Sequence, residues 1–216
     1  MNIVADATAL APVADIVRGR TALSAQEREL MDWIATTYRV SVVAVLADRV
    51  WWGDIPDRLR AVVWLASDAE TETFDDARHN YDSRKQRAIG TRVLADLPEG
   101  APIPFVVPQS FAAEARSDIY GRFTPQDIER ITAELAHPLI AAVRIWTRAV
   151  VFLETDAQVA QYAESAERER WTDVIWRAIH EKDEFGVVPR DAFAIEVDSE
   201  QTFNERFEGS SYYYFL

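Results

Sequence analysis

The segment RAVVWLASDA, residues 60–69, decides the expected fold, because it joins a buried strand to a helix start. An uninterrupted apolar run of this length favours a strand that is buried on both faces. Ser67, directly after it, is a preferred helix N-cap. A second segment, RAVVFLETDA at residues 148–157, repeats both features with Thr155 as the cap. The echo predicts two related halves.

Three further pairs of segments recur in the same order along the chain. Ser24, Gln26 and Glu27 match Thr124, Gln126 and Asp127; Ile103 and Phe105 match Ile195 and Val197; the segment 109–111 matches 201–203. The two copies of the first pair lie 100 residues apart, whereas the two RAVV segments lie 88 residues apart. The first half would therefore contain an insertion of 12 residues between its first helix and its RAVV segment. Chance similarity of caps and Val-rich strands is the alternative.

The expected fold class is α+β, with internally duplicated αββαβ-like halves and helices packed on a mixed or antiparallel sheet. We expect an N-terminal arm over 1–20 and halves over 21–121 and 122–216, together forming one compact unit. Helices are expected at 24–37, 83–97, 109–116, 124–136, 155–180 (one helix or two) and 199–207. Strands are expected at 38–47, 59–66, 105–107, 140–153 (with a bend near Trp146), 193–197 and 212–216. Trp51–Asp57 is expected to form a long hairpin loop.

Composition excludes several functional classes. The chain of 216 residues has 36 acidic and 23 basic residues, a net charge of −13, which disfavours binding to a nucleic-acid backbone or an anionic membrane surface. No apolar run reaches the length of a membrane span, and no signal peptide is visible. Cys is absent, which excludes disulfides and thiol chemistry. We expect a cytoplasmic protein, and the excess of 21 Arg over 2 Lys indicates a bacterial one.

No catalytic residue, metal site or cofactor is predicted. The three His, at positions 79, 137 and 180, lack a recognisable catalytic setting. Asp75 and His79 have helical spacing for two metal ligands, but no third ligand follows from the sequence. No Gly-rich phosphate-binding loop is present.

Two surface features suggest protein binding instead. Trp51, Trp52 and Asp54 lie in the insertion of the first half, where a residue is free to serve recognition, and Trp is frequent at binding hot spots. An acidic run follows the first echo, and it could steer a basic partner. The candidate residues in this run are Asp68, Glu70, Glu72, Asp75 and Asp76.

These features favour a non-catalytic protein-binding module of the immunity or inhibitor type, which neutralises a basic partner such as a toxin or nuclease. The alternative is an enzyme or small-molecule-binding protein that uses a groove between the two pseudo-symmetric halves. A third hypothesis is a structural subunit that self-associates through the aromatic terminal strand at 212–216. The sequence leaves the oligomeric state open.

Overall fold

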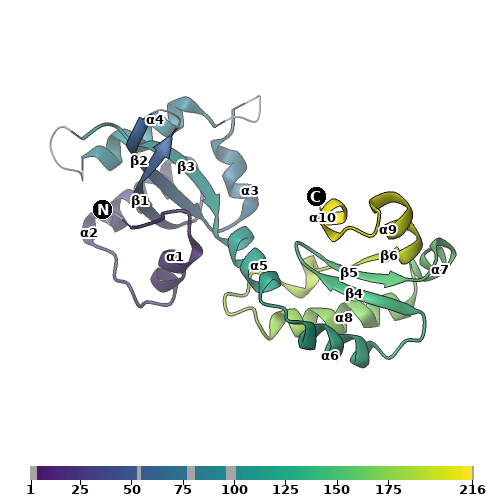
Figure 1. The fold of residues 1–216 in the computed structure, drawn as a ribbon. Helices are drawn as coiled ribbons and strands as arrows, with labels where there is room; N and C mark the ends of the chain where they lie inside the picture. The colour runs from purple at the N-terminus through teal and green to yellow at the C-terminus, as the bar shows by residue number, and fades with distance from the viewer. Residues whose placement is uncertain (1–3, 53–54, 77–80, 96–100, 216) are drawn as a thin grey trace. The chain divides into compact units, whose positions relative to one another are not determined.

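The computed structural model describes residues 4–52, 55–76, 81–95 and 101–215 (Figure 1). The chain divides into two compact units, Met1–Glu114 and Ala115–Leu216, and each is described by itself. Each unit contains helices and one three-stranded mixed sheet. The expected α+β class is therefore confirmed.

The first unit builds its sheet in the order β1-β2-β3. Strands β1 and β2 form an antiparallel hairpin, and β3 joins β2 in parallel. Its elements are α1 (Leu10–Val17), α2 (Ala25–Tyr38), β1 (Val42–Trp52), β2 (Ile55–Leu65), α3 (Asp68–Thr71), the 3₁₀ turn η1 (Glu72–Phe74), α4 (Ser83–Leu94), β3 (Phe105–Ser110) and the start of α5 (Phe111–Gly121).

The second unit has the sheet order β4-β5-β6, with an antiparallel hairpin followed by a parallel third strand. It contains α6 (Pro125–Leu135), β4 (Ile140–Ile145), β5 (Ala149–Leu153), α7 (Asp156–Tyr162), α8 (Ala166–His180), η2 (Arg190–Ala192), β6 (Glu196–Ser199), α9 (Glu200–Phe207) and α10 (Ser211–Phe215). The two sheets thus share strand order and strand directions. Their common origin by duplication stays a prediction.

Both units carry helices on the two faces of the central strand pair. In the first, α2 and α4 cover one face through buried residues such as Ile34 and Ile89. Trp64 is fully buried, and its indole N–H donates to the Ala7 carbonyl at 2.9 Å. The segment before α1, which lies within the predicted N-terminal arm, is thereby held against the sheet.

A buried carboxylate reinforces this attachment. The Asp48 side chain on β1 is only 1% exposed, and it accepts the Ala7 backbone N–H at 2.8 Å. On the neighbouring strand, Arg60 donates to the same carboxylate through Nε at 2.9 Å and through Nη2. A buried charge is tolerated when it is paired and hydrogen-bonded in this way.

The second sheet is also covered on both faces, with α6 and α8 on one side and α9 and α10 on the other (Figure 1). Alternate residues of β5 serve the two layers, as strand geometry requires. Val151 packs with the fully buried Trp171 of α8, while Phe152 packs with Phe203 and Tyr214.

Most element predictions are confirmed, and the differences lie at turns. The capping boxes of Ser24 with Glu27 and Thr124 with Asp127 are both formed. The 155–180 segment is two helices, with Ser165 capping the second. The predicted long loop at 51–57 is wrong, because β1 continues through Trp52 and pairs there with Ile55.

The predicted terminal strand is wrong, since Ser211–Phe215 forms helix α10. Alternation along a strand would place neighbouring rings on opposite faces. Instead Tyr212 and Tyr213 are both exposed, while Tyr214 and Phe215 are both buried. One helical turn achieves this grouping, so the proposed pairing of chains through a terminal strand has no strand to act through.

Gly90 permits close packing of α4, and we expect Gly90→Ala to lower the free energy of unfolding by about 1–3 kcal/mol. An added Cβ would lie 2.8 Å from the Pro104 carbonyl oxygen and 2.9 Å from Ile103 Cγ2. Gly121 is the matched control, because a Cβ there meets nothing within 4 Å. Chemical denaturation should find Gly121→Ala unchanged or slightly stabilised. Equal losses at both positions would contradict the packing argument.

We expect the N-terminal cap of α6 to make the stability of the folded state depend on pH in the acid range. Hydrogen bonds from the Thr124 backbone and hydroxyl, with Lys182 nearby, lower the pKa of Asp127 from 3.8 to about 2. A lowered pKa in the folded state adds stability above pH 4, and this stability is lost as the pH falls towards 2. Denaturation from pH 7 to pH 2 should show Asp127→Asn less stable than wild type at neutral pH, with the difference disappearing in acid. Glu129→Gln, on the exposed face of the same helix, is the control for removal of one negative charge.

Candidate functional site

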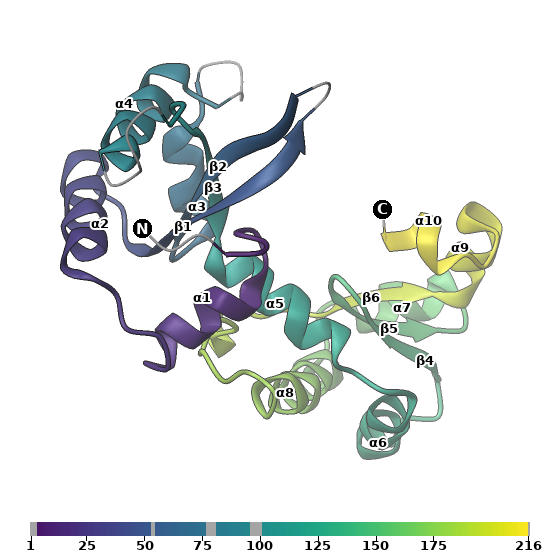
Figure 2. The same ribbon diagram turned by 60° about the vertical axis from the view of Figure 1, so that its left-hand side comes forward.

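The first hairpin extends beyond its sheet as a two-stranded arm, described over residues 49–52 and 55–59 (Figure 2). Strand β3 pairs with β2 only from Arg60 to Leu65, so it gives the arm no third strand. In the second unit, β4 and β5 have only 6 and 5 residues, against 11 in each of β1 and β2. The first hairpin therefore has longer strands than the second, and its arm includes the segment where the sequence predicts an insertion; the insertion itself stays a prediction.

The arm presents Trp51, whose side chain is 74% exposed. The register shifts between Val50 and Trp52, with Asp57 on the opposite strand in the left-handed region at φ 58°. This irregularity is a β-bulge, and bulges commonly turn a side chain away from its regular direction. Arg49 forms an ion pair with Asp57 at 2.8 Å, which links the two strands beside Trp51.

Two of the predicted residues near the tip are only partly placed. The Trp52 backbone pairs with Ile55, but its side chain lies outside the described part of the structure. Asp54 lies wholly outside the described residues. Trp51 is therefore the tip residue on which a site can be built.

The acidic run begins where β2 ends, and two of its carboxylates are bound within the fold. Ser110 donates its hydroxyl to Asp68 at 2.5 Å. Burial raises the pKa of Glu70, but hydrogen bonds from Ser41 and Ser67 outweigh this effect and hold that pKa below its ordinary value. Both carboxylates thus stabilise the helix starts after β2 and β3.

The remaining acidic residues of the run are more accessible. Glu72 and Asp76 are exposed, and Asp75 is partly exposed. Asp75 forms an isolated β-bridge with Tyr81. A pocket of about 360 Å³ at the carboxyl ends of β2 and β3 is lined by Asp68, Asp75, Tyr81 and Ser110.

The arm tip and the acidic run lie at opposite ends of β2. Ten residue steps separate Ile55 from Leu65, which places the two features roughly 30 Å apart at the rise of an extended strand. A standard interface covers roughly 800 Å² of each partner, so it is roughly 30 Å across. One compact interface centred on Trp51 therefore leaves out the acidic run, and the predicted binding residues divide into two groups.

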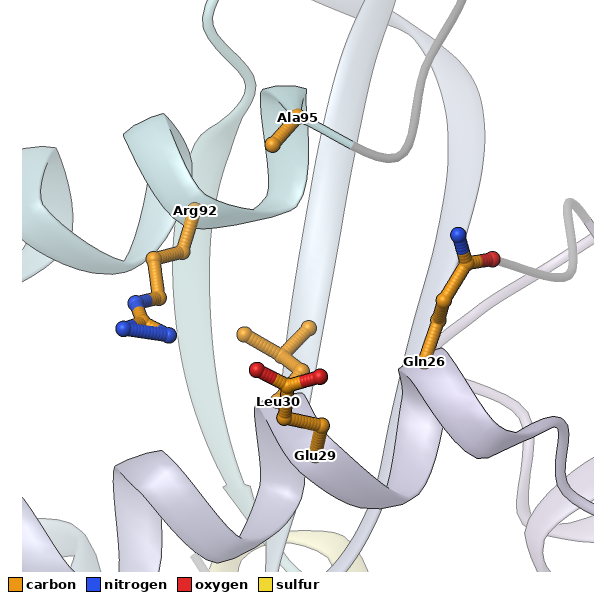
Figure 3. Close-up of a pocket in the computed structure, with 5 residues that line it drawn as sticks. All are labelled: Gln26, Glu29, Leu30, Arg92 and Ala95. Carbon is orange, nitrogen blue, oxygen red and sulfur yellow. The ribbon is translucent and has the colours of Figure 1, made fainter.

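Two further pockets are described, one in each unit. The first, of about 190 Å³, lies between α2 and α4, and Figure 3 shows Glu29 and Arg92 approaching it from the two helices. A pocket of about 400 Å³ in the second unit is lined by Arg168 and Arg190. Both guanidinium groups already donate to carbonyl or carboxylate oxygens. Within the described residues, no group of three or more His, Asp or Glu could hold a metal ion.

Two of the three His occupy aromatic packing positions. His137 contacts Tyr162 and Trp171 edge-on, and its Nδ1 accepts the Leu139 N–H at 3.4 Å. His180 stacks on Trp176 at 4.7 Å. His79, with the proposed Asp75–His79 pair, lies outside the described residues.

The second unit also exposes aromatic side chains, and among them Trp146 had no predicted role in binding. Trp146 at the β4–β5 turn is 50% exposed, and Tyr212 and Tyr213 on α10 are 61% and 56% exposed. The bend predicted at Trp146 marked the turn correctly. The Trp146 ring lies 5.7 Å from that of Phe215, so the helical terminal segment contacts this turn.

The comparisons with known proteins add no relative. No protein-family model, curated protein or solved structure matches the chain. Among the helices of the described residues, none combines the length and apolar character needed to cross a membrane.

Proposed function

We propose that the chain is a protein-binding module that holds its partner through the hairpin arm. The exposure of Trp51 on this arm carries the proposal. A two-stranded ribbon is marginally stable by itself, and an exposed indole is costly to keep in water. A partner that covers the two-stranded arm and the Trp51 indole would explain why the chain has both. Trp is also the side chain most enriched at binding hot spots.

Charge supports a basic partner. The first unit has 17 acidic and 12 basic residues, a net charge of −5, and the second has 19 and 11, a net charge of −8. Complementary charge accelerates encounter and disfavours acidic competitors. We therefore propose a partner of the basic toxin or nuclease kind, neutralised by an immunity-type protein. The acidic run at the far end of β2 acts in steering, outside the compact contact around Trp51.

The test is affinity capture from the native host's lysate with the full-length chain as bait. Wild type and Tyr81→Ala should retain one basic protein in stoichiometric amount, and high salt should weaken this retention. Trp51→Ala should lose it, with the dissociation constant of the purified pair raised at least about 30-fold, as expected for a hot spot.

Tyr81→Ala is the matched control, because Tyr81 is an exposed aromatic residue at the acidic end of the same unit. Full retention by Trp51→Ala would overturn the arm as the binding element. Loss in Tyr81→Ala alone would transfer the contact to the acidic end. The ligand groove between the two halves stays a prediction, since the two units are described each by itself.

A further inference from the structure

We infer that the second unit carries a separate binding surface, an aromatic platform made by Trp146, Tyr212 and Tyr213, which takes an extended Arg-rich or Lys-rich peptide segment. This inference does not depend on the hairpin arm. It rests on the anchoring of α10, the exposure of its outer rings and the charge around them.

The inner side of α10 is fixed to the sheet. Tyr214 and Phe215 are buried, and the Tyr214 hydroxyl donates to Asp198 on β6 at 2.7 Å. Arg148, beside the β4–β5 turn, donates to the Tyr214 carbonyl at 3.0 Å. The Trp146 ring lies 5.7 Å from that of Phe215, so the turn and the helix meet.

The outer side of α10 is left to solvent on this fixed base. Tyr212 and Tyr213 contact each other edge-on at 5.6 Å. All three platform rings are at least 50% exposed. Because Tyr214 and Phe215 already hold α10, a ligand meets rings on an ordered backbone, which reduces the entropy lost on binding.

The surrounding charge selects a cationic ligand. From residue 196 to the last residue, the chain has five acidic residues and one basic residue, Arg206. Arg144 and Arg148 pair with two of these acids, Glu200 and Glu196. Glu205 in α9 and Glu208 directly after it are both exposed. Aromatic faces attract guanidinium and ammonium groups, and neighbouring carboxylates strengthen the preference.

The unit already makes this kind of contact on the inner side of α10. The Arg148 guanidinium lies 5.2 Å from the ring centre of Tyr214 and 5.0 Å from that of Phe215, while it bonds Glu196 at 2.8 Å. A basic peptide on the platform would repeat the same combination of ring and carboxylate with Tyr212, Tyr213 and the exposed Glu residues.

The test uses a fluorescently labelled peptide of twelve alternating Arg and Gly residues, with a Glu-for-Arg peptide as the charge control. Fluorescence anisotropy with the full-length chain should show binding of the Arg peptide alone. Tyr212→Ser with Tyr213→Ser should raise its dissociation constant at least tenfold, and Tyr81→Ser, at an exposed ring of the first unit, should leave it unchanged. Trp146→Ser, on a different element, should weaken binding in the same direction, which protects the result against local unfolding of α10.

Equal binding by wild type and all platform variants would overturn the inference, because general acidity alone would then explain the affinity. So would absence of binding to the wild type. Sedimentation of the free chain gives the other decisive outcome. A dimer that the Tyr212→Ser, Tyr213→Ser variant abolishes would assign the platform to a second copy of this chain and reject a peptide ligand.

Discussion

Arg60→Ala should lower the free energy of unfolding by about 3–5 kcal/mol, because it leaves the buried Asp48 carboxylate without its cation. Loss of this charge pair leaves an uncompensated anion in a site that is 1% exposed. The same substitution removes the Arg60 contact with Asp6 at 3.2 Å, and it thereby weakens the attachment of the N-terminal segment. Urea denaturation, followed by a signal from the first unit, measures the loss.

Arg148→Ala is the matched control for Arg60→Ala, since the two residues hold the same place in the repeated segment. Arg148 pairs with Glu196, which is 52% exposed. Exposed pairs contribute about 0–1 kcal/mol, and loss of the ring contacts adds a similar amount, so about 1–2 kcal/mol is expected. Asp48→Asn with Arg60→Ala should recover part of the larger loss. Equal effects of the two single substitutions would show that the buried carboxylate has no special role.

Replacement of residues 51–57 by Asn-Gly should abolish partner binding while the free energy of unfolding changes by less than about 1 kcal/mol. The Ala47 carbonyl accepts from Val4 and therefore points away from β2. Alternation along the ladder then makes Val50 and Arg58 a hydrogen-bonded pair, which is the pair that a two-residue turn closes. The shortened hairpin keeps this pair and loses the tip that carries Trp51.

Calorimetric titration against the captured partner, with thermal unfolding of both chains, separates the two effects. A shortened chain that still binds with unchanged affinity would exclude the arm as the contact. A shortened chain that unfolds much more easily would show that the tip supports the sheet. A second shortened variant with Gly-Gly at the turn distinguishes a poor turn from a lost contact.

The sequence predicted the helix starts well because their signals are local. Ser24 with Glu27 and Thr124 with Asp127 satisfy backbone groups within four residues, so no distant contact can easily override them. The repeated RAVV segments likewise form the central strands β2 and β5 of their sheets. A continuous apolar run is buried on both sides only in the middle of a sheet.

The terminal segment was predicted incorrectly because three Tyr and a Phe favour a strand by propensity alone. The segment forms a helix because Tyr214 and Phe215 are buried together against Phe152. Phe152 belongs to a strand about 60 residues earlier, so the local sequence does not contain this contact. The binding residues posed a similar difficulty. Trp51 and Asp68 are close in sequence, yet the register of the hairpin places them at opposite ends of β2. Only the strand length reveals that separation.

Among the described side chains, each unit contains one fully buried Trp, Trp64 in the first and Trp171 in the second. The indole of Trp64 donates to a carbonyl, whereas the buried Nε1 of Trp171 has no hydrogen-bond partner in the described structure. The two chromophores therefore experience different polarity, and each loses its surroundings when its own unit opens. Variants that keep only one of them as an emitter would turn the intrinsic fluorescence of this chain into a separate record of the unfolding of each unit.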